Sequence, residues 1–462
     1  MNSATTDDAD ESPVWSSTNM AGLPLNIFEL QQKLYRKAKQ EPGFRFYSLF
    51  GLILRRDVLR SAWARVAANN GSPGVDNVSI AVMEESPGLV EDLLDAIERE
   101  LRAKTYRPSA VRRVMIPKAN GKLRPLGIPT VKDRVVQTAV KIVIEPIFEA
   151  DFLECSHGFR PNRSAHDALR EVKENVKEGR VEVYDADLSS YFDTIPHDKL
   201  MLAVERRIAD RSVLSLIRLW LKAEVEERSD NGGPPKRSRP TAGTPQGGVI
   251  SPLLANLYLH WFDKLFHRAD GPRWWANARL VRYADDLTIQ AKFVGWRISS
   301  WVEDVLEGRF GLTINRSKTS IRRVSPDSDG ALDFLGYRTW HAPDQYGRGT
   351  RYLTAEPSPK AMAAEKENLR KIVCPRMNCV SIPIIIERVN RQMAGWAAYH
   401  NQGRPARCFA RINAFIVNRL YRHIRRRSQR PYRPPDGVRW WQHLTDDLGL
   451  VLLKSPTAKA RR

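Results

Sequence analysis

The first hundred residues contain two different patterns. Residues 1–20 are small, polar and acidic, with little to bury, and they predict a disordered leader. Leu30 and Leu34, and later Leu59 with its apolar neighbours, recur at the spacing of amphipathic helices. The pattern therefore predicts a helical N-terminal extension over residues 21–105.

The segment from Tyr106 to Pro129 changes to the alternation of strands. Val111, Val114 and Ile116 before Pro117 are typical of a strand, and the dipeptide Asn120-Gly121 marks a tight turn. The sequence predicts a basic hairpin here. Its turn is flanked by Lys118, Lys122 and Arg124.

Acidic residues follow predicted strands at two places. Val181–Tyr184 has the β-branched and aromatic residues of a strand and runs into Asp185-Ala186-Asp187, so Asp187 is expected at the end of a strand. Two short apolar runs, Leu280–Tyr283 and Leu287–Ala291, flank Ala284-Asp285-Asp286. This arrangement predicts a tight hairpin with both carboxylates at its tip.

The intervening segments predict helices and one loop. A helix is expected over residues 135–147, and another in which Pro196 occupies the first turn. Ser251 as N-cap and Pro252 at the first helical position predict a third helix. Residues 226–241 contain a Gly-Gly-Pro-Pro run and several basic residues, which indicates an exposed loop.

The chain beyond Tyr352 becomes mainly helical and strongly basic, with its highest density of Arg at Arg419–Arg427. An aromatic stripe that includes Trp396 and Tyr399 precedes this run, and helical aromatic stripes are more often core than stacking platforms. Both residues are therefore expected to pack. The basic run is expected to bind nucleic-acid phosphates with a steep dependence on salt.

Charge strengthens this interpretation. The 462 residues include 74 Lys and Arg against 53 Asp and Glu, a formal net charge of +21. Such an excess favours a polyanionic partner. The four cysteines have no CxxC spacing and are interpreted as reduced, buried thiols. No apolar run is long enough to span a bilayer, so we expect no membrane association and a cytoplasmic location.

The carboxylates carry the candidate chemistry. Nucleotide addition uses two divalent cations, held roughly 4 Å apart by acidic side chains, to activate the attacking hydroxyl and neutralise the leaving pyrophosphate. Asp187, Asp285 and Asp286 would supply the hard oxygen ligands that Mg²⁺ prefers. Adjacent Asp residues in a turn are, however, more often solvated turn formers, so the tetrapeptide Tyr283–Asp286 alone is a weak signal.

The order of the surrounding motifs is far more specific. The chain resembles group II intron-encoded reverse transcriptases and maturases of the endonuclease-less type. The resemblance rests on seven ordered blocks across about half the chain, namely Ile116-Pro117-Lys118 through Arg124-Pro125-Leu126-Gly127-Ile128-Pro129, Ser156-His157-Gly158-Phe159-Arg160-Pro161, Asp185 to Asp193, Gly243 to Pro252, Tyr283-Ala284-Asp285-Asp286, Gly311-Leu312-Thr313-Ile314-Asn315 with Lys318-Thr319, and Phe334-Leu335-Gly336-Tyr337.

The resemblance implies an α+β right-hand polymerase with fingers, palm and thumb, followed by a helical, basic, maturase-like region. Fingers and palm would occupy residues 106–345, thumb and maturase helices 346–405, and a basic nucleic-acid-binding region 406–462. No Cys follows Trp441, so the HNH endonuclease that often ends this family is not expected.

The resemblance also implies roles for individual residues. The catalytic residues would be Asp187, Asp285 and Asp286, and the metal contacts would be Asp187, Leu188, Asp285 and Asp286, holding two Mg²⁺ ions with Mn²⁺ as an alternative. The incoming dNTP would meet Lys118, Arg124, Tyr191, Phe192 and Gln246. Nucleic acid would meet Arg160, Arg163, Arg422, Arg425, Arg426 and Arg427.

Two of these assignments stay open in the sequence. Phe192 is the preferred aromatic gate against a ribose 2′-hydroxyl, but Tyr191 could take its place, with one ring facing the core and the other the pocket as in an extended strand. Arg160 and Arg163 suit template phosphates or, equally well, a structural ion pair.

The implied function is RNA-directed DNA synthesis on a group II intron RNA template, with a DNA primer or target, and with splicing and retrohoming as associated activities. One alternative is a related reverse transcriptase in phage defence or CRISPR adaptation. Another is a splicing cofactor without polymerase activity, against which the intact carboxylates count. The sequence leaves the oligomeric state open.

Overall fold

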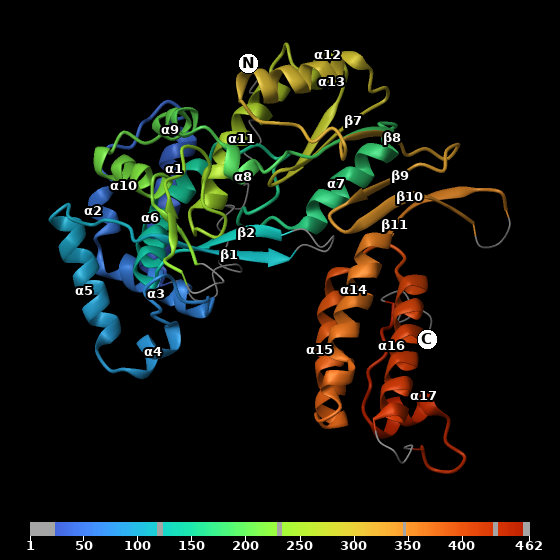
Figure 1. Ribbon diagram of the computed structural model, residues 1–462. Coiled ribbons are helices and arrows are strands. Elements are labelled where there is room, and N and C mark those ends of the chain that lie inside the picture. The colour runs from blue at the N-terminus through green and yellow to red at the C-terminus, as the bar shows by residue number, and fades with distance from the viewer. Residues whose placement is uncertain (1–23, 118–122, 229–232, 345–347, 428–432, 456–462) are drawn as a thin grey trace, which may run out of the picture. The chain divides into compact units, whose positions relative to one another are not determined.

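The computed structural model describes residues 24–117, 123–228, 233–344, 348–427 and 433–455. Its chain divides into two compact units (Figure 1). The first contains the chain up to Ala168, Tyr184–Ile289 and Val294–Ser320, and the second contains Leu169–Val183, Gln290–Phe293 and the chain from Ile321 onward. The predicted leader over residues 1–20 lies outside the described residues.

The first unit begins with helices that pack around one long, buried helix. Helix α6 exposes almost none of its apolar residues, because Val135, Val136, Ala139, Val140 and Val143 are all fully buried. Its neighbours include α1 and α3. The helices of this part are α1 (Leu25–Gln40), α2 (Phe50–Ile53), α3 (Arg56–Ala68), α4 (Ile80–Glu85), α5 (Leu89–Arg102) and α6 (Val131–Glu149).

The predicted basic hairpin is present as β1 (Val111–Pro117) and β2 (Leu123–Ile128), which pair antiparallel with Ile116 opposite Arg124. The predicted turn, with Lys118 and Lys122, lies outside the described residues. The expectation of a loop over residues 226–241 is wrong in part. Strand β4 (Val225–Glu227) pairs parallel to β1, and β5 (Lys236–Ser238) pairs with β4, giving the order β2-β1-β4-β5.

A second four-stranded sheet, with the order β6-β7-β3-β8, carries the acidic motifs. The apolar side chains of these strands are buried. Val183, Leu280, Val281, Leu287 and Ile289 are each at most 1% exposed. The strands are β3 (Glu182–Ala186), β6 (Arg279–Tyr283), β7 (Asp286–Ala291) and β8 (Ser320–Arg323). The helices in the same stretch of the chain are α7 (Ala165–Lys177), α8 (Tyr191–Thr194), α9 (His197–Glu205), α10 (Arg211–Leu221), α11 (Ser251–His267), α12 (Pro272–Trp275) and α13 (Trp296–Glu303).

The second unit has a three-stranded sheet and a helical core. Helix α16 contributes Ile412, Ile416, Leu420 and Ile424, spaced four residues apart and at most 1% exposed. Trp396 is partly buried against this core and contacts Phe409 at a tilt of 54°, with ring centroids 5.7 Å apart, which confirms its packing role. The elements are β9 (Ala331–Phe334), β10 (Tyr337–Pro343), β11 (Arg351–Pro357), α14 (Pro359–Ile372), α15 (Ile382–Tyr399), α16 (Ala406–Arg426) and α17 (Trp440–Gln442).

The cysteines and the longer helices bear on two further expectations. All four cysteines are free, but only Cys155 and Cys408 are buried, so the expectation of buried thiols is wrong for Cys379, which is exposed, and for Cys374, which is half-buried. Among the helices of the described ranges, none combines the length and the apolar character that crossing a bilayer requires.

Candidate active site

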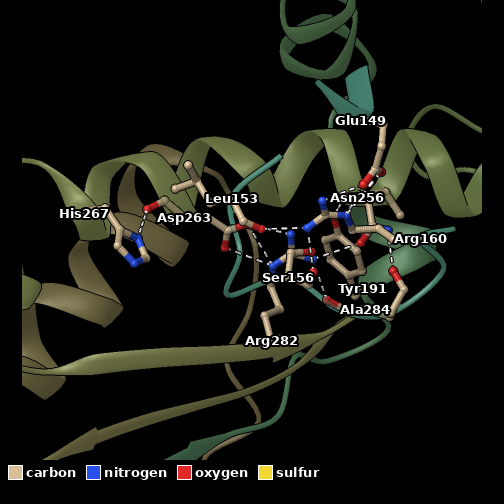
Figure 2. A network of polar contacts seen from close by, with 12 residues as sticks. Glu149, Leu153, Ser156, Arg160, Tyr191, Asn256, Asp263, His267, Arg282 and Ala284 are labelled. Atoms are coloured by element: carbon tan, nitrogen blue, oxygen red, sulfur yellow. Dashed lines mark hydrogen bonds and ion pairs between the residues drawn. The ribbon is translucent and has the colours of Figure 1, made fainter. Parts of the chain in front are cut away.

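A buried ion pair organises the acidic hairpin of the first unit (Figure 2). Arg282 on β6 places Nη2 2.6 Å from Oδ2 of Asp263 on α11, and both side chains are 0% exposed. Its Nη1 donates to the side-chain oxygen of Asn256 and to the carbonyl oxygen of Ala284, each at 3.0 Å. The guanidinium group therefore joins the helix to the turn that carries the two adjacent carboxylates.

The turn itself requires an unusual backbone and a close neighbour. Ala284 has φ +57°, in the left-handed region, where its carbonyl oxygen reaches Arg282. Gly158 lies against the turn, and a Cβ at this position would come within 2.3 Å of the Ala284 nitrogen. Asn256 donates to the Gly158 carbonyl at 2.6 Å. Only glycine fits here without moving the hairpin.

The third carboxylate enters from a neighbouring strand. Asp187 follows the end of β3, which is adjacent to β7 in the sheet. Lys318 Nζ lies 3.0 Å and 2.9 Å from the two carboxylate oxygens of Asp187. The main-chain nitrogen of Asp187 donates to the Thr319 hydroxyl at 3.4 Å, and that of Asn315 donates to the Asp187 carbonyl at 2.8 Å. The segment after Asn315 therefore holds Asp187 and supplies its counter-charge.

The electrostatics show that these carboxylates influence one another. Burial, together with the charge of Asp187, raises the pKa of Asp285. Desolvation by the surrounding protein and repulsion from Asp285, Asp185 and Asp187 raise the pKa of Asp286 to about 7, against a partial opposing effect of Lys318. Negative charge is thus concentrated beyond what the nearby ammonium group neutralises, and an added cation would relieve it.

The donor chemistry suits a hard divalent cation, although the side chains are not arranged around one. Among the residues that the structure describes, no three His, Cys, Asp or Glu side chains are grouped as ligands of one ion. Lys318 instead provides the positive charge at Asp187. Leu188, another expected metal contact, has a buried apolar side chain, which leaves only its main-chain carbonyl as a donor.

The two candidate gate residues have different environments. Tyr191 is 2% exposed, and its hydroxyl donates to the Ala255 carbonyl at 2.6 Å, so the expectation that Tyr191 contacts the dNTP is wrong. Phe192 is half-buried and stacks edge-to-face on Phe159 with ring centroids 6.5 Å apart. The two rings differ in burial because they lie on helix α8, and not on the extended strand that the alternation suggested.

The Gln246 loop packs against the fingers hairpin. Gly127 on β2 donates its N–H to the Gln246 carbonyl at 2.5 Å. Gly247 has φ +104°, and a Cβ there would lie 2.3 Å from the Gly127 carbonyl oxygen, so this contact requires glycine. The Gln246 side chain is half-buried, and Arg124 is exposed on β2. Lys118 lies outside the described residues.

Arg160 is a structural residue, which corrects its expected role in nucleic-acid binding. Its guanidinium group is 2.6 Å from Glu149, and the two side chains are 3% and 1% exposed. The remaining donors reach the carbonyl oxygens of Leu153 and Ser156 at 2.6 and 2.7 Å. All three guanidinium nitrogens are thus engaged inside the protein, which explains the burial of the side chain. Arg163 pairs with the exposed Glu154, and its nucleic-acid role stays a prediction.

The basic run forms the end of α16 in the second unit. Arg422, Arg425 and Arg426 are exposed, whereas Arg427 is half-buried. Arg425 also lies over the Tyr421 ring, 5.3 Å from its centroid. The apolar residues Leu420 and Ile424 face the core of the unit. The exposed Arg side chains are therefore accessible to a polyanion.

Three residues that build the site carry little signal in the sequence. Arg282 and Asp263 each interrupt an otherwise apolar segment of a strand or helix, and that interruption was the available signal for a buried pair. Lys318 was identified only as part of a motif block. Its contact with Asp187 joins positions 131 residues apart, and spacing gives no indication of such a contact.

Comparisons with known proteins agree with this geometry. A model described as "Reverse transcriptase (RNA-dependent DNA polymerase)" matches residues 116–339, and one described as "Group II intron, maturase-specific domain" matches residues 362–441. Protein YkfC of Escherichia coli is 37% identical over 371 residues, which cover 72% of this chain and 93% of that protein.

This chain belongs to the group II intron reverse transcriptase and maturase family. The family fold is the right-hand polymerase, and its activity is RNA-directed DNA synthesis. Another family member, group II intron-encoded protein LtrA of Lactococcus lactis, is 38% identical over 220 residues, 47% of this chain and 35% of LtrA. Nuclear intron maturase 4 of Arabidopsis thaliana is 30% identical over 47% of this chain and 25% of its own length. The chain thus spans about a third or less of these two longer relatives.

Replacing Arg282 with Met should destabilise this reverse transcriptase by about 3–5 kcal/mol, because Asp263 would remain as an unpaired buried charge. The double variant Arg282→Met/Asp263→Leu should lose less than the single variant, since no charge is then left behind. Arg279→Met, on the same strand, is the control and should cost about 1 kcal/mol or less. Denaturant unfolding measures each free energy. An Arg282→Met variant as stable as the wild type would contradict the anchoring role.

If Asp286 is a ligand of the divalent cation, its raised pKa predicts that Mg²⁺ binds more weakly in acid. Below about pH 7 the carboxyl carries a proton that must leave before a cation binds, so affinity should rise with pH up to that value, by at most about tenfold per unit. Calorimetric titration at about pH 6 and about pH 8 measures this. Asp286→Asn should bind Mg²⁺ weakly with a flatter pH dependence, and Asp270→Asn should behave as the wild type. Equal wild-type affinities at both pH values would refute the prediction.

Proposed function

We propose that this family member copies a group II intron RNA into DNA from a DNA primer and assists the splicing of that intron. The observation that carries the proposal is the crowding of Asp187, Asp285 and Asp286 at adjacent strands of one sheet, where their mutual repulsion calls for cations. The maturase-specific match over residues 362–441 supports the intron assignment. The alternatives of phage defence and of a splicing cofactor without polymerase activity have no observation in their favour.

Asp187, Asp285 and Asp286 are proposed to hold two Mg²⁺ ions, with the Leu188 carbonyl oxygen as a further donor. Bound Mg²⁺ supplies activation of the primer hydroxyl and neutralisation of the pyrophosphate. Within the protein, Arg282 keeps the Asp285 and Asp286 turn in position through the Ala284 carbonyl. Lys318 preserves the orientation of Asp187 by binding both of its oxygens.

The remaining residues are proposed to orient the dNTP. Lys118 and Arg124 from the fingers hairpin bind its phosphates, a role suited to their fixed positive charge. Gln246, whose loop is attached to β2 through Gly127, contacts the base or its template partner. Phe192 faces the sugar and excludes a 2′-hydroxyl by contact. The half-buried position of Phe192, next to the buried Tyr191, supports this choice.

The second unit is proposed to bind the RNA. Residues 346–405 would form thumb and maturase helices, and residues 406–462 a basic region in which Arg422, Arg425, Arg426 and Arg427 contact phosphates. Arg422, Arg425 and Arg426 are exposed and Arg427 is half-buried, which supports this role. Arg163 is a further candidate in the first unit. Residues 106–345 would form fingers and palm, preceded by a helical extension over 21–105.

Replacing Asp285 and Asp286 together with Ala should abolish primer extension on an RNA template, with activity falling by several orders of magnitude because the cation ligands are lost. RNA binding should stay within about twofold, since neither carboxylate contacts phosphate directly. The control Asp92→Ala/Asp270→Ala removes the same charge from the surface. Extension assays and filter binding measure the two effects, and persistent DNA synthesis by the first variant would refute the metal assignment.

Replacing Phe192 with Ala should increase ribonucleotide incorporation relative to deoxynucleotides by about tenfold or more, because the truncated side chain no longer excludes the 2′-hydroxyl. Tyr191→Phe, which only removes the hydrogen bond to Ala255, should leave sugar selection unchanged. Steady-state incorporation of rCTP and dCTP by each variant measures the ratio. A change in the ratio with Tyr191→Ala and none with Phe192→Ala would move the gate to Tyr191.

A further inference from the structure

The first unit contains a cleft that shares no residue with the carboxylate site. It encloses about 400 Å³ and lies among residues 42–45, the end of α9 and the second half of α11. Its volume is within the range of ordinary small-molecule sites. Neither the polymerase reaction nor the RNA contacts proposed for the second unit uses this cleft.

Two polar side chains of α11 in this cleft have unsatisfied hydrogen-bonding groups. His260 is 2% exposed, and neither ring nitrogen has a hydrogen-bond partner among the described residues. The buried Nε1 of Trp261 likewise has none within those ranges. A buried donor or acceptor without a partner costs about 1–3 kcal/mol. A ligand in the cleft that forms hydrogen bonds with these three nitrogen atoms would remove that cost.

His260 is neutral and therefore offers one donor and one acceptor. Burial, and then the charges of Lys264, Arg282 and Arg160, hold its pKa well below the usual range. The ring packs edge-on against Phe152, with centroids 5.4 Å apart, which fixes its plane. A neutral imidazole and an indole N–H together match the hydrogen-bonding edge of a heteroaromatic base.

The rim of the cleft is cationic. Arg206 and Lys264 lie over Trp261, at 5.5 Å and 5.1 Å from the ring centroid, and neither has an ion-pair partner in the described part of the chain. The acidic residues of the cleft are already paired. Asp151 lies 3.0 Å from Arg207, and Glu205 pairs with Arg218. Arg206 and Lys264 are thus exposed at the cleft, where each of its two carboxylates has an arginine partner and the charge of Asp151 also acts on Lys264.

We propose that this cleft binds a single nucleotide, with its phosphate at Arg206 and Lys264 and its base at His260 and Trp261. A simple anion would satisfy the rim but leave the imidazole and indole groups unpaired, and an apolar ligand would satisfy neither. Aromatic and cationic side chains are also the usual partners of an unstacked nucleotide. The nucleotide is either free or one residue of a single-stranded RNA, and the two sources share this chemistry.

The test compares Arg206→Ala/Lys264→Ala with a control, Arg102→Ala/Arg268→Ala, which removes equal charge from exposed positions outside the cleft. Calorimetry of the full chain with AMP, GMP, CMP and UMP in EDTA tests the free nucleotide. Photocrosslinking of short single-stranded RNA containing 4-thiouridine, with mapping of the peptide that contains Trp261, tests the RNA source.

The cleft variant should lose at least tenfold in monophosphate affinity, in crosslinking to that peptide, or in both, while the control stays within twofold. If the cleft variant loses only monophosphate affinity, the ligand is a free nucleotide. If it loses only crosslinking, the ligand is a residue of single-stranded RNA. If the wild type neither binds a monophosphate nor crosslinks at that peptide, or if both double variants behave alike, the proposal is overturned.

His260→Phe separates binding from folding. It fills the same space without unpaired nitrogens, so the midpoint of thermal unfolding should stay level or rise while nucleotide binding or crosslinking falls. Primer extension should persist because His260 is outside the polymerase site. This measurement checks only that the variant is folded. Unchanged binding and crosslinking in His260→Phe would also overturn the proposal.

Discussion

The ion pair between Arg282 and Asp263 is the interaction on which the site depends. Removing two charges completely from water is costly, and the cost is offset only when every donor finds a partner. Arg282 meets that condition, since its guanidinium group also binds Asn256 and the Ala284 carbonyl. Its main chain in turn exchanges hydrogen bonds with Cys155 and His157. One residue thus connects a strand, a helix, a turn and the segment that leads to Gly158.

This anchoring allows the site to concentrate charge that would otherwise move apart. Repulsion among the carboxylates favours separation of the Asp285 and Asp286 turn from Asp187. Burial, and then this repulsion, raises the pKa of Asp286 to about 7. The turn stays in position because its backbone is fixed from behind by Arg282, and Asp187 stays because Lys318 and the segment after Asn315 hold it.

The sequence predicted the parts of the site that depend on local pattern. Apolar runs around Asp285 correctly placed it between two strands, and Val183 with its neighbours placed Asp187 at a strand end. Partners distant in sequence could not be predicted this way. Arg160 was considered for phosphate binding because nothing local indicates that Glu149, on a buried helix, completes its ion pair. Tyr191 and Phe192 were read along a strand, but the helical turn α8 determines which ring is buried.

A structure of the protein with an RNA–DNA primer–template, Mg²⁺ and a dNTP tests the account most directly. The account predicts ions held by Asp187, Asp285 and Asp286, with Lys318 withdrawn from Asp187 and the Arg282–Asp263 pair unchanged. Ions bound elsewhere, or a Lys318–Asp187 contact that persists in the complex, would contradict it.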